Sequence, residues 1–288
     1  MRDKTRGEIG HDRGTGALLG LAVGDALGTT LEFKARDSRP PLTDLIGGGA
    51  FGLKPGEWTD DTSMALCLSE SLIAKGGRID PADLMDRFLR WYRQGENSVT
   101  CRCFDIGIAT RSALERFERT GETAASLPPD PNGAGNGTLM RLAPVAILAA
   151  PDVALAMDLA EAQSRTTHRA SVAHEACRIF AAMLVDAMAG QSKGNVLRPR
   201  AAGGGLAPIA AGAWQSKARK AISSSGYVVS TLEASLWCVD RTESFEDAVL
   251  LAANLGDDAD TVAAVTGQLA GALYGKAGIP VRWLERLA

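Results

Sequence analysis

Two acidic clusters near opposite ends of the chain constrain its fold most strongly, because each stands at the start of a predicted apolar helix. Residues 59–62 read Thr-Asp-Asp-Thr and lead into residues 63–66, whereas residues 257–261 read Asp-Asp-Ala-Asp-Thr and lead into residues 262–265. Carboxylates and hydroxyls at this density are the hard oxygen ligands that Mg²⁺ and Mn²⁺ prefer. If the fold brings the two clusters together, they form one metal site for about two cations.

Helix capping is the alternative explanation for each cluster. Thr59 is a residue type favoured at the N-cap, and acidic residues in a first turn interact well with the positive end of the helix dipole. Capping, however, needs only one side-chain oxygen and at most one charge. Adjacent aspartates repel each other unless a cation neutralises them. The two clusters together therefore favour a metal site.

Composition limits the class of protein. The chain has 288 residues, a net charge of −3 and 45% hydrophobic residues, so it can build a sizeable core and carries no basic field for nucleic acid. The cysteines are too few and too scattered for a disulfide framework, and the Cys-x-Cys pair lacks a second pair for zinc. We expect five reduced thiols in a cytoplasmic protein. The cysteines are Cys67, Cys101, Cys103, Cys177 and Cys238.

The polar N-terminal residues 1–13 contain no apolar segment, so we expect a flexible tail rather than a signal or an anchor. No run reaches the roughly 18 apolar residues of a membrane span. The most apolar stretch, 142–150, contains Pro144. The sequence therefore predicts no membrane span.

Helical periodicity dominates the chain, and alternating β-branched residues are scarce. Gly267, Gly271 and Gly275 recur four residues apart, which predicts a central helix that another element approaches closely on one side. The predicted helices cover residues 16–30, 59–75, 81–93, 105–118, 138–149, 152–163, 170–189, 228–239, 243–253, 260–275 and 280–287.

Three long loops separate these helices, over residues 35–57, 127–137 and 191–212, and the last is expected to be mobile. Loops of this length inside a domain are more often functional than idle. None is a domain linker, because the candidate metal-binding residues lie on both sides of all three. We therefore predict one compact all-α domain over residues 14–288.

Two isolated carboxylates could take part in chemistry. Glu32 follows the first predicted helix, where an anion has no capping value, so it is either solvated or held beside a cation. Asp105 presents the same choice, with an ordinary N-cap as a third possibility.

Weaker candidates lie in the middle of the chain. The glycine-rich residues 133–138 precede a predicted helix, where backbone amides could cradle a phosphate, although such a turn is usually only a turn. His168 could be a ligand or a hydrogen-bonded structural residue. Tyr227, taken by itself, is expected to pack in the core.

Six short motifs follow one another along the chain. In this order they resemble the ADP-ribosylglycohydrolases, most closely the bacterial dinitrogenase-reductase-activating type, over about residues 14–275. The two aspartate motifs together with the asparagine–glycine loop make the resemblance specific. The motifs are residues 24–28 (Gly-Asp-Ala-Leu-Gly) with Glu32, residues 59–62, residues 104–107 (Phe-Asp-Ile-Gly), residues 135–141 (Gly-Asn-Gly-Thr-Leu-Met-Arg), residues 167–168 and residues 256–261.

The resemblance implies an all-helical fold around a binuclear Mg²⁺ or Mn²⁺ centre, with Asp257 as a neighbour of the ligands. Glu32 would lie over the metals, and Asp105 matches the catalytic carboxylate of the arginine-specific branch. Either carboxylate could take the proton of the attacking water. The implied metal ligands are Thr59, Asp60, Asp61, Asp258, Asp260 and Thr261, and the implied substrate-binding residues are Gly135, Asn136, Gly137, Thr138, His168 and Tyr227.

The activity implied is hydrolysis of the N-glycosidic bond between ADP-ribose and a protein arginine, which reverses mono-ADP-ribosylation. The expected partners are the modified protein and the ADP-ribose product, with no nucleic acid, and the chain is expected to be a monomer. Ile108 and Ala109 stand where the family leads us to expect a more polar pair. The alternatives are a hydrolase for serine- or O-acyl-linked ADP-ribose, a non-catalytic ADP-ribose-binding relative, or an unrelated two-metal phosphohydrolase.

Overall fold

The computed structural model describes the backbone of residues 2–288 and the side chains of residue 7 and residues 10–288. Over this part of the chain the structure consists of helices and turns without a β-strand, so the predicted all-α fold is confirmed. The α-helices are α1 (Arg2–Gly28), α2 (Asp60–Ala74), α3 (Pro81–Gln94), α4 (Ile108–Thr120), α5 (Ala143–Ala149), α6 (Val153–Ser164), α7 (Ser171–Met188), α8 (Lys193–Val196), α9 (Ala207–Ala210), α10 (Val228–Asp240), α11 (Phe245–Ala253), α12 (Ala259–Tyr274) and α13 (Val281–Leu284). Short 3₁₀ helices are η1 (Thr29–Leu31), η2 (Ala124–Ser126), η3 (Gly204–Leu206), η4 (Ala213–Ser216), η5 (Arg219–Ala221) and η6 (Lys276–Gly278).

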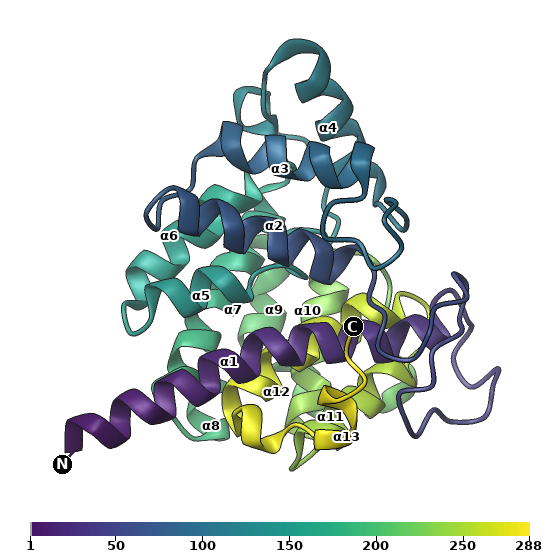
Figure 1. The fold of residues 1–288 in the computed structure, drawn as a ribbon. Coiled ribbons are helices and arrows are strands. Elements are labelled where there is room, and N and C mark those ends of the chain that lie inside the picture. The colour runs from purple at the N-terminus through teal and green to yellow at the C-terminus, as the bar shows by residue number, and fades with distance from the viewer. Residues whose placement is uncertain (1) are drawn as a thin grey trace.

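Helices α1 and α12 form the central pair of the fold, and they lie side by side in Figure 1. Small residues meet along the whole contact: a Cβ atom added at Gly20 or Gly24 would overlap a backbone carbonyl of α12. In return, a Cβ atom at Gly267 would overlap the carbonyl of Gly20. The predicted close approach to the glycine-rich helix is therefore confirmed, and α1 is the element that makes it.

The remaining helices surround this pair. Helix α12 is buried from Ala259 to Leu273 because α1, α7, α10 and α11 cover it. Figure 1 shows α2, α3 and α4 in successive layers above α1, towards the narrow end of the molecule. The first turns of α2 and α12, which carry the two acidic clusters, both lie close to the C-terminal end of α1.

Several predicted boundaries differ from the structure. Helix α1 begins at Arg2 rather than at residue 16, so residues 2–13 continue the helix, and the flexibility of this segment stays a prediction. Helix α5 begins only at Ala143, because Pro144 is accommodated in its first turn and residues 138–142 form turns. The predicted loop over residues 191–212 contains the short helices α8 and α9. Residues 35–57 form the irregular loop that the sequence predicts.

All five cysteines are free, and three of them, Cys67, Cys177 and Cys238, are buried. This agrees with the prediction of reduced thiols. Among the described residues, no helix combines the length and apolar character needed to cross a membrane.

Candidate active site

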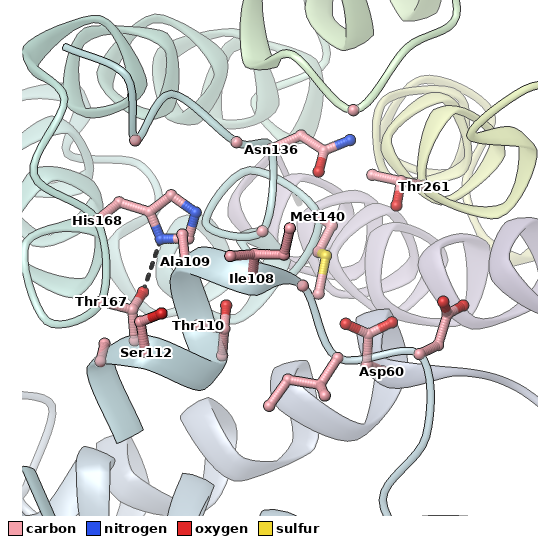
Figure 2. A pocket seen from close by; sticks show the side chains of 18 of the residues that line it. Asp60, Ile108, Ala109, Thr110, Ser112, Asn136, Met140, Thr167, His168 and Thr261 are labelled. Atoms are coloured by element: carbon pink, nitrogen blue, oxygen red, sulfur yellow. Dashed lines mark hydrogen bonds between the residues drawn. The ribbon is translucent and has the colours of Figure 1, made fainter. Parts of the chain in front are cut away.

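A cavity of about 1130 Å³ opens beside the first turns of α2, α4 and α12. One end is acidic, with carboxylates of Glu32, Asp60 and Asp260 in its lining. Figure 2 shows Asp60 and Thr261 on one side of this cavity and His168 on the other, with Ile108 and Met140 between them. The cavity therefore joins the predicted metal residues to the predicted ADP-ribose residues.

The two acidic clusters meet at the acidic end, as the sequence predicts. The hydroxyl oxygen of Thr59 lies 3.3 Å from Oδ2 of Asp260. The hydroxyl of Thr261 donates to Oδ2 of Asp61 over 3.4 Å. Each threonine thus reaches across to a carboxylate of the other cluster.

Asp25 in α1, to which sequence reasoning assigned no role, caps helix α2 from a distance. Its Oδ1 accepts hydrogen bonds from the backbone N–H and the hydroxyl of Thr59 at 2.9 and 2.8 Å. Its Oδ2 accepts from the N–H and the hydroxyl of Thr62 at 3.0 and 2.6 Å. The expectation that the Thr59 side chain itself caps the helix is wrong: Thr59 occupies the N-cap position but makes no side-chain cap.

Glu32 does the same for helix α12. Its Oε2 accepts hydrogen bonds from the backbone N–H groups of Ala259 and Asp260 at 2.7 and 3.2 Å. The prediction that Glu32 has no capping value holds for the helix that it follows in the sequence. It is wrong for α12, which Glu32 caps from a distant part of the chain. Asp258, at the N-cap of α12, makes no side-chain cap.

The helix caps of α2 and α12 come from residues outside the two acidic clusters. Carboxylates of α1 and of the turn after it satisfy N–H groups in the first turns of α2 and α12. Asp60, Asp61 and Asp258 therefore cap neither helix and are available to a ligand. Of the second cluster, only Asp260 accepts a hydrogen bond from a first-turn N–H, that of Thr261 over 2.7 Å, so capping does not account for Asp60, Asp61 and Asp258.

The carboxyl groups at the acidic end are buried close together, which disfavours their ionised forms. Burial, and then the neighbouring carboxylates, raise the pKa values of Asp60, Asp61 and Asp260 well above the ordinary range. Burial and the charge of Asp260 raise the pKa of Asp258 to about 7, and the same causes raise the pKa of Glu32 to about 12. A bound cation would remove the repulsion and return these groups to their ionised form.

The residues at this end fit a hard divalent cation. Carboxylate oxygens of Glu32, Asp258 and Asp260 lie within 4.8 Å of one another. Oδ1 of Asp61 is buried and has no hydrogen-bond partner among the described residues, so this oxygen is free to bind a ligand. The donors are all oxygen atoms, as Mg²⁺ or Mn²⁺ requires.

Asp105 lies beside the acidic end but outside any helix. Its backbone φ is +60°, and helix α4 begins three residues later with Gly107 as the N-cap, so the N-cap alternative for Asp105 is wrong. Burial raises the pKa of this half-buried carboxyl to about 6. Asp105 can therefore change its protonation state near neutral pH.

The asparagine–glycine loop contributes three of its four predicted residues to the cavity: Gly135, Asn136 and Gly137. The amide of Asn136 donates to Oδ2 of Asp258 over 2.6 Å, which links this loop to the acidic end. The hydroxyl of Thr138 instead accepts from Ser164 in the core, so Thr138 lies away from the cavity. Turns separate this loop from α5, so the expected phosphate site at the start of a helix is not formed there.

His168 is held in place by a buried cation that sequence reasoning missed. Nη2 of Arg141 donates to the Thr167 hydroxyl over 3.0 Å, and that hydroxyl lies 2.9 Å from Nδ1 of His168. The Arg141 guanidinium also lies over the Phe88 ring at 4.6 Å and is fully buried, so burial lowers its pKa to about 9. Arg141 belongs to a quoted motif, but only its contact with Thr167 reveals what it does.

The ring of His168 faces the glycines of the loop. Its Nε2 would lie 3.3 Å from a Cβ atom at Gly135 and 3.5 Å from one at Gly137, so glycine leaves room for the imidazole and a ligand. With Nδ1 held by Thr167, Nε2 is the nitrogen directed to the cavity (Figure 2). This arrangement suits a neutral imidazole that donates one N–H to an anionic ligand.

We expect His168 to remain neutral in the folded protein. Burial, and then the charge of Arg141, lower its pKa to about 3, whereas the unfolded chain binds a proton near pH 6.5. The stability that the neutral ring contributes is complete above pH 6.5 and is lost as the pH falls from 6.5 towards 3. When the pH is lowered from 7 to 5, wild type should therefore lose about 2 kcal/mol more free energy of unfolding than His168→Gln, which has no imidazole to protonate. Urea unfolding at both pH values measures this, and two parallel curves would contradict it.

Tyr227 does not occupy the predicted place. Its side chain is 45% exposed, so the expected core packing is wrong. Its backbone forms an isolated bridge with Gly135, and its side chain is not among those that line the cavity. Stacking of Tyr227 on ADP-ribose stays a prediction.

Ile108 and Ala109, which stand where a more polar pair is expected, line the cavity, and Ile108 is 87% exposed. The first turns of the same helix supply polar groups from Thr110 and Ser112. Helix α4 therefore offers the cavity one apolar and one polar surface.

The fold and this site define a family of hydrolases. The family model described as ADP-ribosylglycohydrolase matches residues 7–288. The chain belongs to the ADP-ribosylglycohydrolase family.

Among its relatives, the ADP-ribosylarginine hydrolase Tri1 of Pseudomonas putida (strain GB-1) is 51% identical over 279 residues, covering 96% of this chain and 74% of the relative. The ADP-ribosyl-[dinitrogen reductase] glycohydrolase of Rhodospirillum rubrum is 34% identical over 287 residues, covering 96% and 90%. A solved structure titled ADP-ribosylglycohydrolase-related protein complex matches with a TM-score of 0.85 and 44% identity, covering 98% of this chain and 94% of that one.

Proposed function

We propose that this protein is a metal-dependent hydrolase that cleaves the N-glycosidic bond between ADP-ribose and a modified protein arginine. The observation that carries the proposal is the acidic end of the cavity, where distant caps leave Asp60, Asp61 and Asp258 available to a cation. A relative 51% identical over almost the whole chain is named ADP-ribosylarginine hydrolase, which supports the arginine linkage.

The proposed cation site combines side chains of both acidic clusters. Two divalent cations, Mn²⁺ or Mg²⁺, bound there would supply Lewis-acid chemistry and neutralise the carboxylates. The unpartnered Oδ1 of Asp61 and the raised pKa values of the buried aspartates support this assignment. The residues proposed to hold them are Thr59, Asp60, Asp61, Asp258, Asp260 and Thr261.

Asp105 is the better candidate for the base. Oε2 of Glu32 already accepts two backbone hydrogen bonds, whereas Asp105 lies half-buried in the lining with a pKa raised to about 6. The Asp105 carboxylate takes a proton from the attacking water as its oxygen bonds to the anomeric carbon. The bond from that carbon to the guanidine nitrogen breaks, and Asp105 returns the proton to this nitrogen.

Glu32 and the loop residues position the substrate. The negative charge of Glu32, fixed by the first turn of α12, stabilises the positive charge that develops on the ribose as the bond breaks. Gly135 and Gly137 leave space for the diphosphate, and Nε2 of His168 donates a hydrogen bond to it. Asn136 connects both regions through its bond to Asp258.

The proposed partner is an ADP-ribosylated protein, met in the cytoplasm by a monomer of this chain. The five free thiols support a reducing compartment.

The proposal is tested by incubating an arginine-ADP-ribosylated protein with the enzyme and Mn²⁺. We expect release of free ADP-ribose, loss of that release with EDTA, and loss with Asp60→Ala. Binding of ADP-ribose without release would instead indicate another linkage or a non-catalytic relative. Release of phosphate would indicate a phosphohydrolase, and neither release nor binding would contradict the proposed function altogether.

A further inference from the structure

Phe33 is an exposed aromatic residue at the acidic end of the cavity. It follows Glu32 directly, it lines the same cavity as Glu32 and Asp105, and it is 64% exposed. Its backbone φ is +59°, in the left-handed region that bulky residues rarely adopt. An exposed phenylalanine in a strained conformation at this place needs a reason beyond packing.

A backbone pairing with the second acidic cluster holds Phe33 in this conformation. The N–H of Phe33 donates to the carbonyl of Asp257 over 2.8 Å, and the N–H of Asp257 donates back to the carbonyl of Lys34 over 2.8 Å. Asp257 also has a positive φ, of 64°. The backbone of Phe33 is thereby fixed to the turn that precedes the proposed ligands Asp258 and Asp260.

Two further aromatic rings form a cluster with Phe33. Phe51 meets it edge-on, with ring centroids 6.1 Å apart and planes at 73°. Phe51 also packs on Phe104, with centroids 5.1 Å apart. Phe33 directly follows Glu32, and Phe104 directly precedes Asp105. The aromatic cluster therefore lies next to both proposed catalytic carboxylates.

The chemistry around Phe33 selects a particular kind of group. An aromatic face attracts a cation, and a planar guanidinium can also stack on it. The surrounding carboxylates of Glu32 and Asp105 favour a positive charge and disfavour the anionic diphosphate of a nucleotide. The diphosphate is assigned to His168, which lies across the cavity from Asp60 (Figure 2). The group attached to the scissile bond is therefore the one that reaches Phe33.

We propose that the ring of Phe33 is the platform for the guanidinium of the modified arginine, and that it makes the site selective for arginine-linked ADP-ribose. The inference rests on the proposed function, because it concerns the leaving group of that reaction. Phe33 contacts the departing guanidinium and does not contact the ADP-ribose that stays in the site.

The test compares Phe33→Leu with Phe51→Leu and Phe33→Trp, using ADP-ribosyl-agmatine as a small substrate with a guanidinium. Leucine keeps a Cβ atom and apolar bulk but has no aromatic face. We expect Phe33→Leu to lower kcat/KM about 5- to 20-fold, the range of a partly exposed cation–π contact. Inhibition by ADP-ribose should stay within about twofold of wild type, and Phe33→Trp should retain activity.

Phe51→Leu is the matched control, since Phe51 belongs to the same cluster but does not line the cavity. An equal loss in this control would show that the cluster is only structural. Weaker inhibition by ADP-ribose in Phe33→Leu would place the ring on the nucleotide and overturn the proposal, as would an unchanged kcat/KM. A wild-type enzyme that does not hydrolyse the substrate at all would instead contradict the proposed function.

Discussion

Replacing Asp260 with asparagine should reduce hydrolysis by at least about 10²- to 10³-fold, the largest effect on activity that we expect of any single substitution. Asp260 is 2% exposed, its Oδ2 lies 3.3 Å from the Thr59 hydroxyl, and its carboxylate lies with those of Glu32 and Asp258. Asparagine keeps the size of the side chain but removes the charge that a divalent cation needs. Initial rates with saturating Mn²⁺ measure the loss.

Thermal unfolding of the same variant separates cation binding from folding. Without added metal, Asp260→Asn should be at least as stable as wild type, because it removes one charge from a buried, mutually repelling cluster. At a metal concentration about 100 times the dissociation constant, wild type should gain about 5–10 °C in Tm, and the variant should gain much less. Asp257→Asn is the control, since this neighbouring carboxylate is exposed, and it should behave as wild type. Equal responses of all three proteins to Mn²⁺ would contradict a cation site built on Asp260.

Gly24→Ala should lower the free energy of unfolding by about 3–5 kcal/mol, the largest effect on stability that we expect. A Cβ atom at Gly24 would overlap the carbonyl oxygen of Ala263 and lie 2.6 Å from its carbon and 2.9 Å from the nitrogen of Ala264. These are backbone atoms of a buried helix, so the two central helices must separate. Since Gly24 precedes Asp25, the cap of α2 should be disturbed as well, and activity should fall with stability.

Gly14→Ala is the matched substitution on the same helix. A Cβ atom there would lie 3.7 Å from Ile147 and Met188, which is ordinary contact, so we expect a gain of about 0.5–1 kcal/mol from helix propensity. Chemical denaturation of both variants measures the two effects. A loss of similar size in Gly14→Ala would show that the helix, rather than the close contact with α12, is sensitive to substitution.

Short-range patterns predicted most of the helices. Polar caps, prolines and glycines act within a few residues, which is why α3 begins at Pro81 behind the cap of Asp80 as expected. The left-handed backbone of Asp105 before α4 depends on how that segment meets the rest of the protein. The same holds for Thr138, whose hydroxyl is bound in the core beside Ser164.

By itself the sequence determined that this is an all-α chain with two oxygen-rich clusters, and the order of its motifs identified the family. It could not decide between capping and metal binding, because both use the same residue types at the same place on a helix. Only the tertiary structure decided which groups cap α2 and α12, since the close contact of α1 with α12 brings Asp25 and Glu32 to N–H groups that the local side chains would otherwise cap. A buried helix end needs one set of acceptors, and here a distant segment supplies it, which leaves the aspartates of both clusters to face each other across the site.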